Sequence, residues 1–346
     1  MKSVILVPRK DGRSGLIAQV EERPDPLPGP GELVVDMKAC GLCGTDLEKM
    51  KGEYTASLPV IGHEAVGSVS ALGPGVGGLK KGDRVFPHHH VPCYECYICK
   101  AGNETMCDRY RSSYLDPSGF SESFRVPAWN VEKGGVLKMP PAMSYEVGSL
   151  IEPLACCVRA VRMCRVRRTD TVLIAGAGPV GMMHALLLKP MGAKVLLSDV
   201  SETRLELAER YGAGLALDAS RVNIPDRMRS ETQGRGADLA IVASGSRDAI
   251  IQGLRSIRRG GRVCLFGVPS KGSILDYDIS LLYNAEQGIL TSYGATEEDT
   301  KEALKVLSSR GEEFARLITH WFPLARFDDA VAAASEARAM KVVVTP

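Results

Sequence analysis

Two short segments in the first part of the chain carry side chains of the types that serve as zinc ligands. The segment Cys40–Asp46 contains two cysteines, and the segment Gly62–Glu64 ends in a histidine and a glutamate. Zinc takes thiolate sulfur, imidazole nitrogen and carboxylate oxygen, and a catalytic zinc keeps one position open for water or substrate. A thiolate from the first segment, together with His63 and Glu64 from a separate loop, therefore predicts an open catalytic zinc site.

Four further cysteines lie close together in the sequence. They are Cys93, Cys96, Cys99 and Cys107, separated by two, two and seven residues. Four thiolates in a short segment can close a tetrahedral shell, which fits a structural zinc with no open position. Four unrelated thiols are a poor explanation for so regular a spacing in a polar loop. We therefore predict a structural zinc lobe, spanning about residues 88–112, that depends on the metal for its folding.

Three adjacent histidines, His88–His90, precede this lobe. Neighbouring side chains on a strand point to opposite faces, so three in a row cannot converge on one metal ion. We expect them to line or edge a strand near the cleft. Contact between one of them and the substrate is the alternative.

Further along, the chain contains a glycine motif between a strand and a helix. The apolar run 171–175 leads directly into Gly176–Gly181, which has the form G-x-G-x-x-G. With an acidic residue at the end of the next strand, this is the fingerprint of dinucleotide binding. Gly176 permits the tight turn, Gly178 lets the pyrophosphate approach the helix N-terminus, and Gly181 lets helix and strand pack closely.

The acidic residue of this fingerprint is Asp199, at the end of the strand-like run 194–199. A carboxylate there accepts hydrogen bonds from the adenosine ribose and repels a 2′-phosphate, which favours NAD over NADP. Arg204 follows five residues later and is expected to pack near the adenine. The residues expected to contact the cofactor are Gly176, Gly178, Pro179, Val180, Gly181, Asp199, Arg204, Val268 and Ser292.

Glu152, followed by Pro153, lies at the junction between these two regions. Apolar residues flank it on both sides, which indicates burial, and a buried carboxylate needs a metal or another partner. We therefore expect Glu152 to contact the metal or the substrate. The alternatives are a surface carboxylate or the acidic start of a helix.

The composition is that of a soluble globular protein with more than one domain. Of its 346 residues, 45% are hydrophobic and 24% are charged, and the formal charge is +2. So small a charge gives no reason to expect binding to nucleic acid or to a membrane. The sequence has neither the apolar run of a membrane span nor a signal peptide, and clustered cysteines without secretory features are typical of metal binding. We therefore expect a cytoplasmic protein.

The pattern of elements predicts two kinds of domain. Short β-like runs broken by Gly and Pro, from Val4 to about Phe86, predict a barrel or a sandwich. From about Arg168, strands alternate with helices, which predicts a doubly wound parallel sheet. The tail, with a helix from about Glu297 to Arg310 and a final strand at Lys341–Val344, is expected to rejoin the N-terminal domain. The predicted domains are 1–153 with 296–346, and 154–295.

With these motifs in view, the sequence resembles the zinc-dependent medium-chain dehydrogenase/reductase superfamily, and within it the branch of polyol (sorbitol-type) and threonine dehydrogenases. The resemblance runs essentially end to end, and it is carried by Cys43, Gly62–Glu64, the four-cysteine lobe, Glu152–Pro153 and Gly176–Gly181. It implies a GroES-like β-barrel as the catalytic domain, completed by the C-terminal segment, and a Rossmann domain between. It also implies a homodimer joined through the Rossmann sheet edge at 289–293, or a homotetramer.

The same resemblance implies a set of ligands for the catalytic zinc. Cys43 and His63 match the first two ligands, and Glu64 matches a residue that binds the zinc directly in some members and supports it in others. Glu152 takes a position that is cysteine in many simple alcohol dehydrogenases. This carboxylate departs from the two-cysteine, one-histidine set of alcohol dehydrogenase and points to polyol-type enzymes.

The resemblance also implies supporting roles for two side chains close to Cys43. Asp46 matches the carboxylate that orients the ligating imidazole of His63. Thr45 matches the hydroxyl that takes the proton of the substrate alcohol. Cys40 is then left as a packing residue.

The implied activity is transfer of hydride from a secondary alcohol, such as a polyol, sugar or cyclitol, to NAD, giving a ketone. An L-threonine 3-dehydrogenase and a simple secondary-alcohol dehydrogenase are alternatives of the same class. A zinc-free reductase of this fold would lack the metal ligands, and a non-catalytic NAD-binding protein would show no turnover. Candidate pocket residues are Leu47, Met50, Tyr54, His88, Tyr114 and Arg159.

Overall fold

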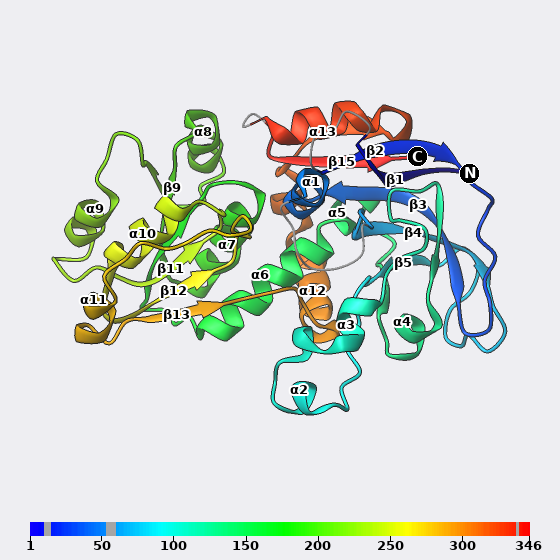
Figure 1. Cartoon of the computed structure of the whole chain (residues 1–346), viewed down its shortest axis with the longest axis horizontal. Helices are drawn as coiled ribbons and strands as arrows, with labels where there is room; N and C mark the ends of the chain where they lie inside the picture. The colour runs from blue at the N-terminus through cyan, green and yellow to red at the C-terminus, as the bar shows by residue number, and fades with distance from the viewer. Residues whose placement is uncertain (10–14, 53–59, 337–338) are drawn as a thin grey trace. The chain divides into compact units, whose positions relative to one another are not determined.

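The chain divides into two compact units in a computed structural model that describes residues 1–9, 15–52, 60–336 and 339–346. The first unit combines Met1–Ala155 with Gly294–Pro346, and the second is Cys156–Tyr293 (Figure 1). No helix in the described ranges is long and apolar enough to cross a membrane.

The first unit is built on an open sheet with the strand order β14-β15-β3-β4-β5-β7. Strand β6 joins this sheet by pairing with β3. Strands β1 and β2 pair with each other in a separate two-stranded sheet. Its strands are β1 (Lys2–Pro8), β2 (Leu16–Glu22), β3 (Leu33–Leu42), β4 (Glu64–Leu72), β5 (Arg84–Pro87), β6 (Ser123–Val126), β7 (Val136–Lys138), β14 (Ile318–Pro323) and β15 (Lys341–Thr345). Its helices are α1 (Gly44–Lys51), α2 (Tyr97–Lys100), η1 (Glu104–Met106), α3 (Asp108–Ser112), α4 (Ala128–Glu132), α5 (Tyr145–Gly148), α12 (Glu297–Ala315), η3 (Leu324–Arg326) and α13 (Phe327–Ser335).

The C-terminal strand completes this sheet. β15 pairs antiparallel with β3, so that Val342 lies opposite Leu42 and Val344 opposite Cys40. Phe120 and Phe327 meet edge to face in the buried cluster beneath, with ring centroids 4.8 Å apart. The last residues of the chain are therefore held beside the strand that leads into Cys43.

The second unit is a Rossmann domain with the strand order β10-β9-β8-β11-β12-β13, in which every pair is parallel. Because the order reverses between β8 and β11, ligands of such sheets bind at the carboxyl ends of these strands. The strands are β8 (Thr171–Ala175), β9 (Lys194–Asp199), β10 (Leu215–Asp218), β11 (Ala237–Val242), β12 (Ile257–Leu265) and β13 (Gly288–Thr291). The helices are α7 (Pro179–Leu188), η2 (Lys189–Met191), α8 (Glu202–Arg210), α9 (Ile224–Glu231), α10 (Arg247–Ser256) and α11 (Ile279–Asn284), and α6 (Ile151–Cys164) enters from the first unit.

The predicted fold class, a GroES-like domain with a Rossmann domain, is confirmed by this topology. Every residue of β8 is buried, as its uninterrupted apolar sequence predicts for a central parallel strand. Ser201 caps α8 by accepting the backbone N–H of Arg204.

Candidate functional site

The candidate metal ligands lie at the ends of two paired strands rather than on separate loops. Cys43 follows the last residue of β3 and caps α1, while Glu64 begins β4 directly opposite Gly41 of β3. One ligand atom from each of Cys43, His63 and Glu64 lies within 4.8 Å of the other two. This donor set of sulfur, nitrogen and oxygen fits zinc.

Asp46 holds the imidazole of this group. Its carboxylate is fully buried and accepts the N–H of Cys43 at 3.1 Å and of Gly62 at 3.2 Å. Nδ1 of His63 lies 3.3 Å from the same carboxylate, so in the neutral ring Nδ1 carries the proton and Nε2 offers its lone pair to a metal. Burial lowers the pKa of His63, but the charges of Asp46 and Cys43 outweigh it and raise that pKa well above its usual range.

Lys341 lies next to the site, a position that the sequence did not predict for it. It begins β15, is buried, forms an ion pair through Nζ with Glu64 Oε2, and donates to the carbonyl of Leu42 at 3.1 Å. Burial raises the pKa of Glu64, with Lys341 and His63 opposing that rise and Glu152 adding to it. A Cβ at Gly41 would lie 1.9 Å from Oε2 of Glu64, so only glycine leaves room for this ion pair.

The other predicted residues of the site surround this group. The hydroxyl of Thr45 lies 2.9 Å from Sγ of Cys43. Glu152 is buried in the first turn of α6, but its carboxylate is outside the group of mutually close ligand atoms. Cys40 is fully buried, and burial raises the pKa of its thiol well above the usual range, as for a packing residue.

The three histidines form a buried aromatic cluster next to the metal ligands. They follow the end of β5, so the alternation expected of a strand does not apply to them. The ring centroids of His89 and His90 are 3.9 Å apart, and that of His89 lies 5.0 Å from the centroid of His63. Burial lowers the pKa of His89 well below its usual range, which keeps this ring neutral.

The predicted pocket residues are only partly gathered around this cluster. The ring of Tyr114 meets His90 edge to face, with the centroids 4.6 Å apart. Leu47 packs instead against the core of the first unit, Arg159 belongs to the second unit, and Tyr54 lies outside the described residues.

The four-cysteine lobe contains a second candidate metal centre. Sγ atoms of Cys93, Cys96, Cys99 and Cys107 all lie within 4.8 Å of one another. Backbone N–H groups of Glu95 and Cys96 donate to Cys93 and lower its pKa to about 6, whereas burial raises the pKa of Cys99 to about 12. Four cysteine sulfur atoms at this separation are the donor set of a tetrahedral structural zinc, so a divalent cation such as zinc fits the centre.

The glycine motif of the second unit has the geometry that a pyrophosphate needs. Gly176 has φ of +112°, and a Cβ at Gly181 would lie 1.9 Å from the carbonyl oxygen of Gly176. A Cβ at Gly178 would meet nothing closer than 3.8 Å, so the backbone at the start of α7 is open to a ligand. Pro179 and Val180 form the first turn of this helix.

Asp199 and Arg204 lie together beside the motif. The carboxylate of Asp199 accepts backbone N–H groups of Ala177, Val200 and Ser201 at 2.7–2.9 Å, which fixes it at the end of β9. Nη1 of Arg204 lies 3.8 Å from Asp199 Oδ2. The placement of this arginine near the adenine stays a prediction, and in the structure its positive charge lies next to the Asp199 carboxylate.

The last two predicted cofactor residues follow neighbouring strands. Val268 is exposed just after β12. Ser292 lies one residue beyond β13, and its buried hydroxyl has no hydrogen-bond partner among the described residues. A cofactor hydroxyl or amide is one group that would satisfy it.

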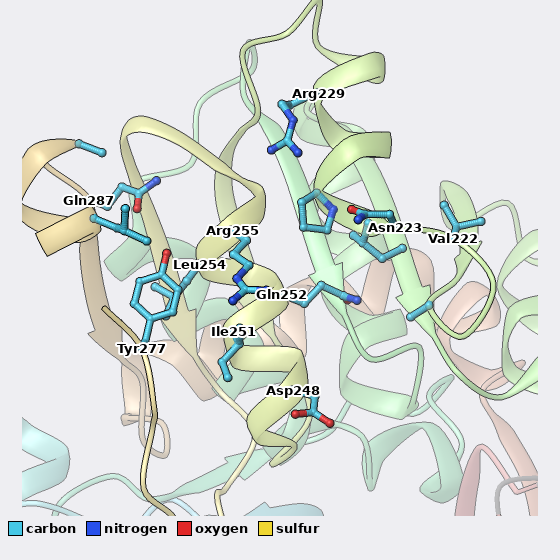
Figure 2. Close-up of a pocket in the computed structure, with 15 residues that line it drawn as sticks. Val222, Asn223, Arg229, Asp248, Ile251, Gln252, Leu254, Arg255, Tyr277 and Gln287 are labelled. Carbon is cyan, nitrogen blue, oxygen red and sulfur yellow. The ribbon is translucent and has the colours of Figure 1, made fainter. Parts of the chain in front are cut away.

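A hollow of about 720 Å³ lies elsewhere on the second unit. Gln252 and Arg255 of α10 line it together with Asn223 and Tyr277 (Figure 2). None of the residues predicted to contact the cofactor lines it. The hollow is therefore separate from the glycine motif.

Comparison with known proteins agrees with this geometry. The alcohol dehydrogenase GroES-like domain model matches residues 29–141, and the zinc-binding dehydrogenase model matches residues 179–309. The chain is 32% identical to an L-threonine 3-dehydrogenase of Saccharopolyspora erythraea and 28% identical to a sorbitol dehydrogenase of Halalkalibacterium halodurans, each alignment covering 94% of this chain and 95% of the relative.

A solved structure from Sinorhizobium meliloti 1021, determined with NADP bound, superposes with a TM-score of 0.87 at 27% identity, over 100% of this chain and 99% of that one. The sequence relatives and the fold agree. The chain therefore belongs to the zinc-binding dehydrogenases of the medium-chain dehydrogenase/reductase superfamily.

Proposed function

We propose that this dehydrogenase transfers a hydride from a secondary alcohol to NAD and produces a ketone, with zinc held by Cys43, His63 and a carboxylate. The observation that carries the proposal is the convergence of Cys43, His63 and Glu64 within 4.8 Å. A bound zinc would supply the Lewis acidity that makes the alcohol proton easier to lose, and the nicotinamide would accept the hydride.

The side chains around the metal have distinct parts in this proposal. Asp46 keeps the proton of His63 on Nδ1, so that Nε2 remains available as a ligand. Thr45, whose hydroxyl lies 2.9 Å from Cys43 Sγ, takes the proton of the substrate alcohol and passes it outward. Glu64 and Glu152 are the two carboxylates that complete the metal environment or contact substrate hydroxyls.

A polyol, sugar or cyclitol is the proposed substrate class, because carboxylates near the metal suit a substrate with several hydroxyls. The sorbitol dehydrogenase relative supports this class, and the L-threonine 3-dehydrogenase relative supports threonine as the second candidate. A screen of NADH formation over polyols, sugars, cyclitols, threonine and simple secondary alcohols tests the proposal. Zinc-loaded protein that binds NAD but oxidises none of them would instead be a non-catalytic NAD-binding protein.

The proposed preference for NAD is based on the carboxylate of Asp199. The test must also include NADP, because the nearby positive charge of Arg204 could accommodate its 2′-phosphate. Replacing Asp199 with asparagine removes the charge that favours the ribose hydroxyls, so KM for NAD should rise on the order of 10-fold and KM for NADP should not. The control is Asp218→Asn at the end of β10, where the carboxylate also accepts a backbone N–H, that of Ser220. Equal rises for both cofactors, or a change in the control, would contradict the role of Asp199.

We further propose a homodimer or homotetramer formed through the edge strand β13. Within the described residues this strand pairs only with β12, and exposed apolar side chains gather on the same part of the chain, among them Ile274, Ile279, Tyr283 and Ile289. Light scattering should give two or four times the 37.2 kDa chain mass, and Ile289→Lys, which disrupts this interface, should halve the measured mass. A monomeric wild type would refute this interface. A cytoplasmic location stays a prediction from the composition.

A further inference from the structure

The carboxylate of Glu297 joins two parts of the first unit. It is the first residue of α12, it is buried, and both of its oxygens are used. Oε1 lies 2.7 Å from Nδ1 of His88, and Oε2 accepts the hydroxyl proton of Tyr94. Among the described residues no lysine or arginine forms an ion pair with it, so these two donors and the helix N-terminus stabilise its charge.

Tyr94 connects this carboxylate to the four-cysteine lobe. It stands between Cys93 and Cys96 and has φ of +61°, a conformation that non-glycine residues adopt only where the surroundings enforce it. The N–H groups of Glu95 and Cys96 point at Cys93 Sγ, so this turn is wrapped around a sulfur atom. A metal bound by Cys93 and Cys96 would hold the turn, and with it the Tyr94 hydroxyl.

His88 connects the same carboxylate to the candidate catalytic site. Its ring meets the ring of His89 edge to face at 5.4 Å, and the ring of His89 lies 5.0 Å from that of His63. The amide of Asn130 donates to the carbonyls of His88 and His89 at 2.7 and 3.2 Å, which fixes their backbone. A displacement of His88 therefore has to move the ring that packs on His63.

We propose that Glu297 is a positioning residue for the catalytic metal site, and that Tyr94, Glu297 and His88 transmit the state of the four-cysteine lobe to His63. This inference rests on the proposed function, because it assumes that His63 binds a catalytic zinc. The four-cysteine lobe then contributes to catalysis as well as to local stability. A metal-loaded lobe holds Tyr94 in place, and through the buried carboxylate of Glu297 it also holds the rings of His88 and His89 beside His63.

The test compares zinc release from the two centres. Glu297→Gln cannot replace the carboxylate, because both partners are donors and the amide offers only one acceptor oxygen. Tyr94→Phe removes only the hydroxyl. The matched control is Glu95→Gln, which breaks the 3.0 Å ion pair between the lobe and Lys133 without touching Glu297.

Zinc transfer from each protein to a coloured chelator is followed in time. The kinetic phase of the catalytic centre is the one that is absent in Cys43→Ala, and the phase of the four-cysteine lobe is the one that is absent in Cys96→Ser. Glu297→Gln and Tyr94→Phe should each accelerate release from the catalytic centre on the order of 10-fold, as expected for loss of a group that supports a metal ligand. The double variant should be no faster than the single ones, because both break one connection. Release from the lobe should change less than release from the catalytic centre in Glu297→Gln, and Glu95→Gln should alter neither phase.

The outcomes separate the inference from the function on which it rests. Two zinc ions per wild-type chain, with the catalytic phase unchanged in both variants, would overturn the inference and leave the proposed function standing. Equal acceleration of both phases in Glu297→Gln, with a lower unfolding midpoint, would indicate a merely structural role and would also overturn it. A wild type that holds zinc only in the lobe would overturn the proposed function and the inference together.

Discussion

Replacing Cys43 with alanine is expected to remove the catalytic zinc and nearly all alcohol oxidation, while the fold survives. Cys43 supplies the sulfur among three candidate ligands whose atoms lie within 4.8 Å, so its loss leaves one imidazole and a carboxylate already paired with Lys341. Loss of the metal should cost about 4 kcal/mol of transition-state stabilisation, roughly a 10³-fold fall in kcat/KM. The start of α1 should persist, because the Asp46 carboxylate still accepts the backbone N–H of residue 43, although the reciprocal contact of the Asp46 backbone N–H with the Cys43 side chain is lost.

Zinc content by mass spectrometry, steady-state kinetics and circular dichroism measure these effects. Cys40→Ala is the matched control, because this buried thiol lies three residues earlier on β3 and outside the ligand group. It should lose about 1–2 kcal/mol of stability through a small cavity and keep both zinc and activity. Full activity in Cys43→Ala would remove Cys43 from the site.

Structural features that depend on residues close together in the sequence were predictable. The strand β8, the glycine motif and α7 follow one another without a gap, so their hydrophobic pattern and glycine positions specify the turn at Gly176. The four cysteines likewise lie within one short lobe, and their sulfur atoms meet as their spacing predicts. The edge strand β10 was not predicted, because it is short and only partly buried.

Features that depend on strand pairing were not predictable. The strand at Lys341–Val344 was expected, but a local pattern does not state which strand it will join or in which register. Its pairing with β3 carries the Nζ of Lys341 to the carbonyl of Leu42 across 299 positions of sequence. The three histidines were expected to line or edge a strand near the cleft. They directly follow β5 and pack beside His63, but the side-chain alternation assumed for them was wrong, because β5 ends at Pro87 and the chain bends there.

Replacing Lys341 with methionine is expected to destabilise the protein more than most single substitutions. The change preserves the length of the side chain and removes the only lysine or arginine that pairs with the Glu64 carboxylate among the described residues. Both residues are almost completely buried, so Glu64 would be left as an uncompensated charge in the interior. The free energy of unfolding of the metal-stripped protein should fall by about 3–5 kcal/mol, measured by urea denaturation at neutral pH.

A second variant separates the charge from the shape of the side chain. Lys341→Met combined with Glu64→Gln removes both charges and should recover most of the lost stability, because the penalty comes from the unpaired carboxylate. Lys133→Met is the surface control, since its ion pair with the exposed Glu95 should contribute about 1 kcal/mol or less. With zinc bound the deficit should shrink, because the cation next to Glu64 takes over part of the role of Lys341. A single variant as stable as the wild type, or a double variant no better than the single one, would show that this ion pair does not hold Glu64 at the edge of the site.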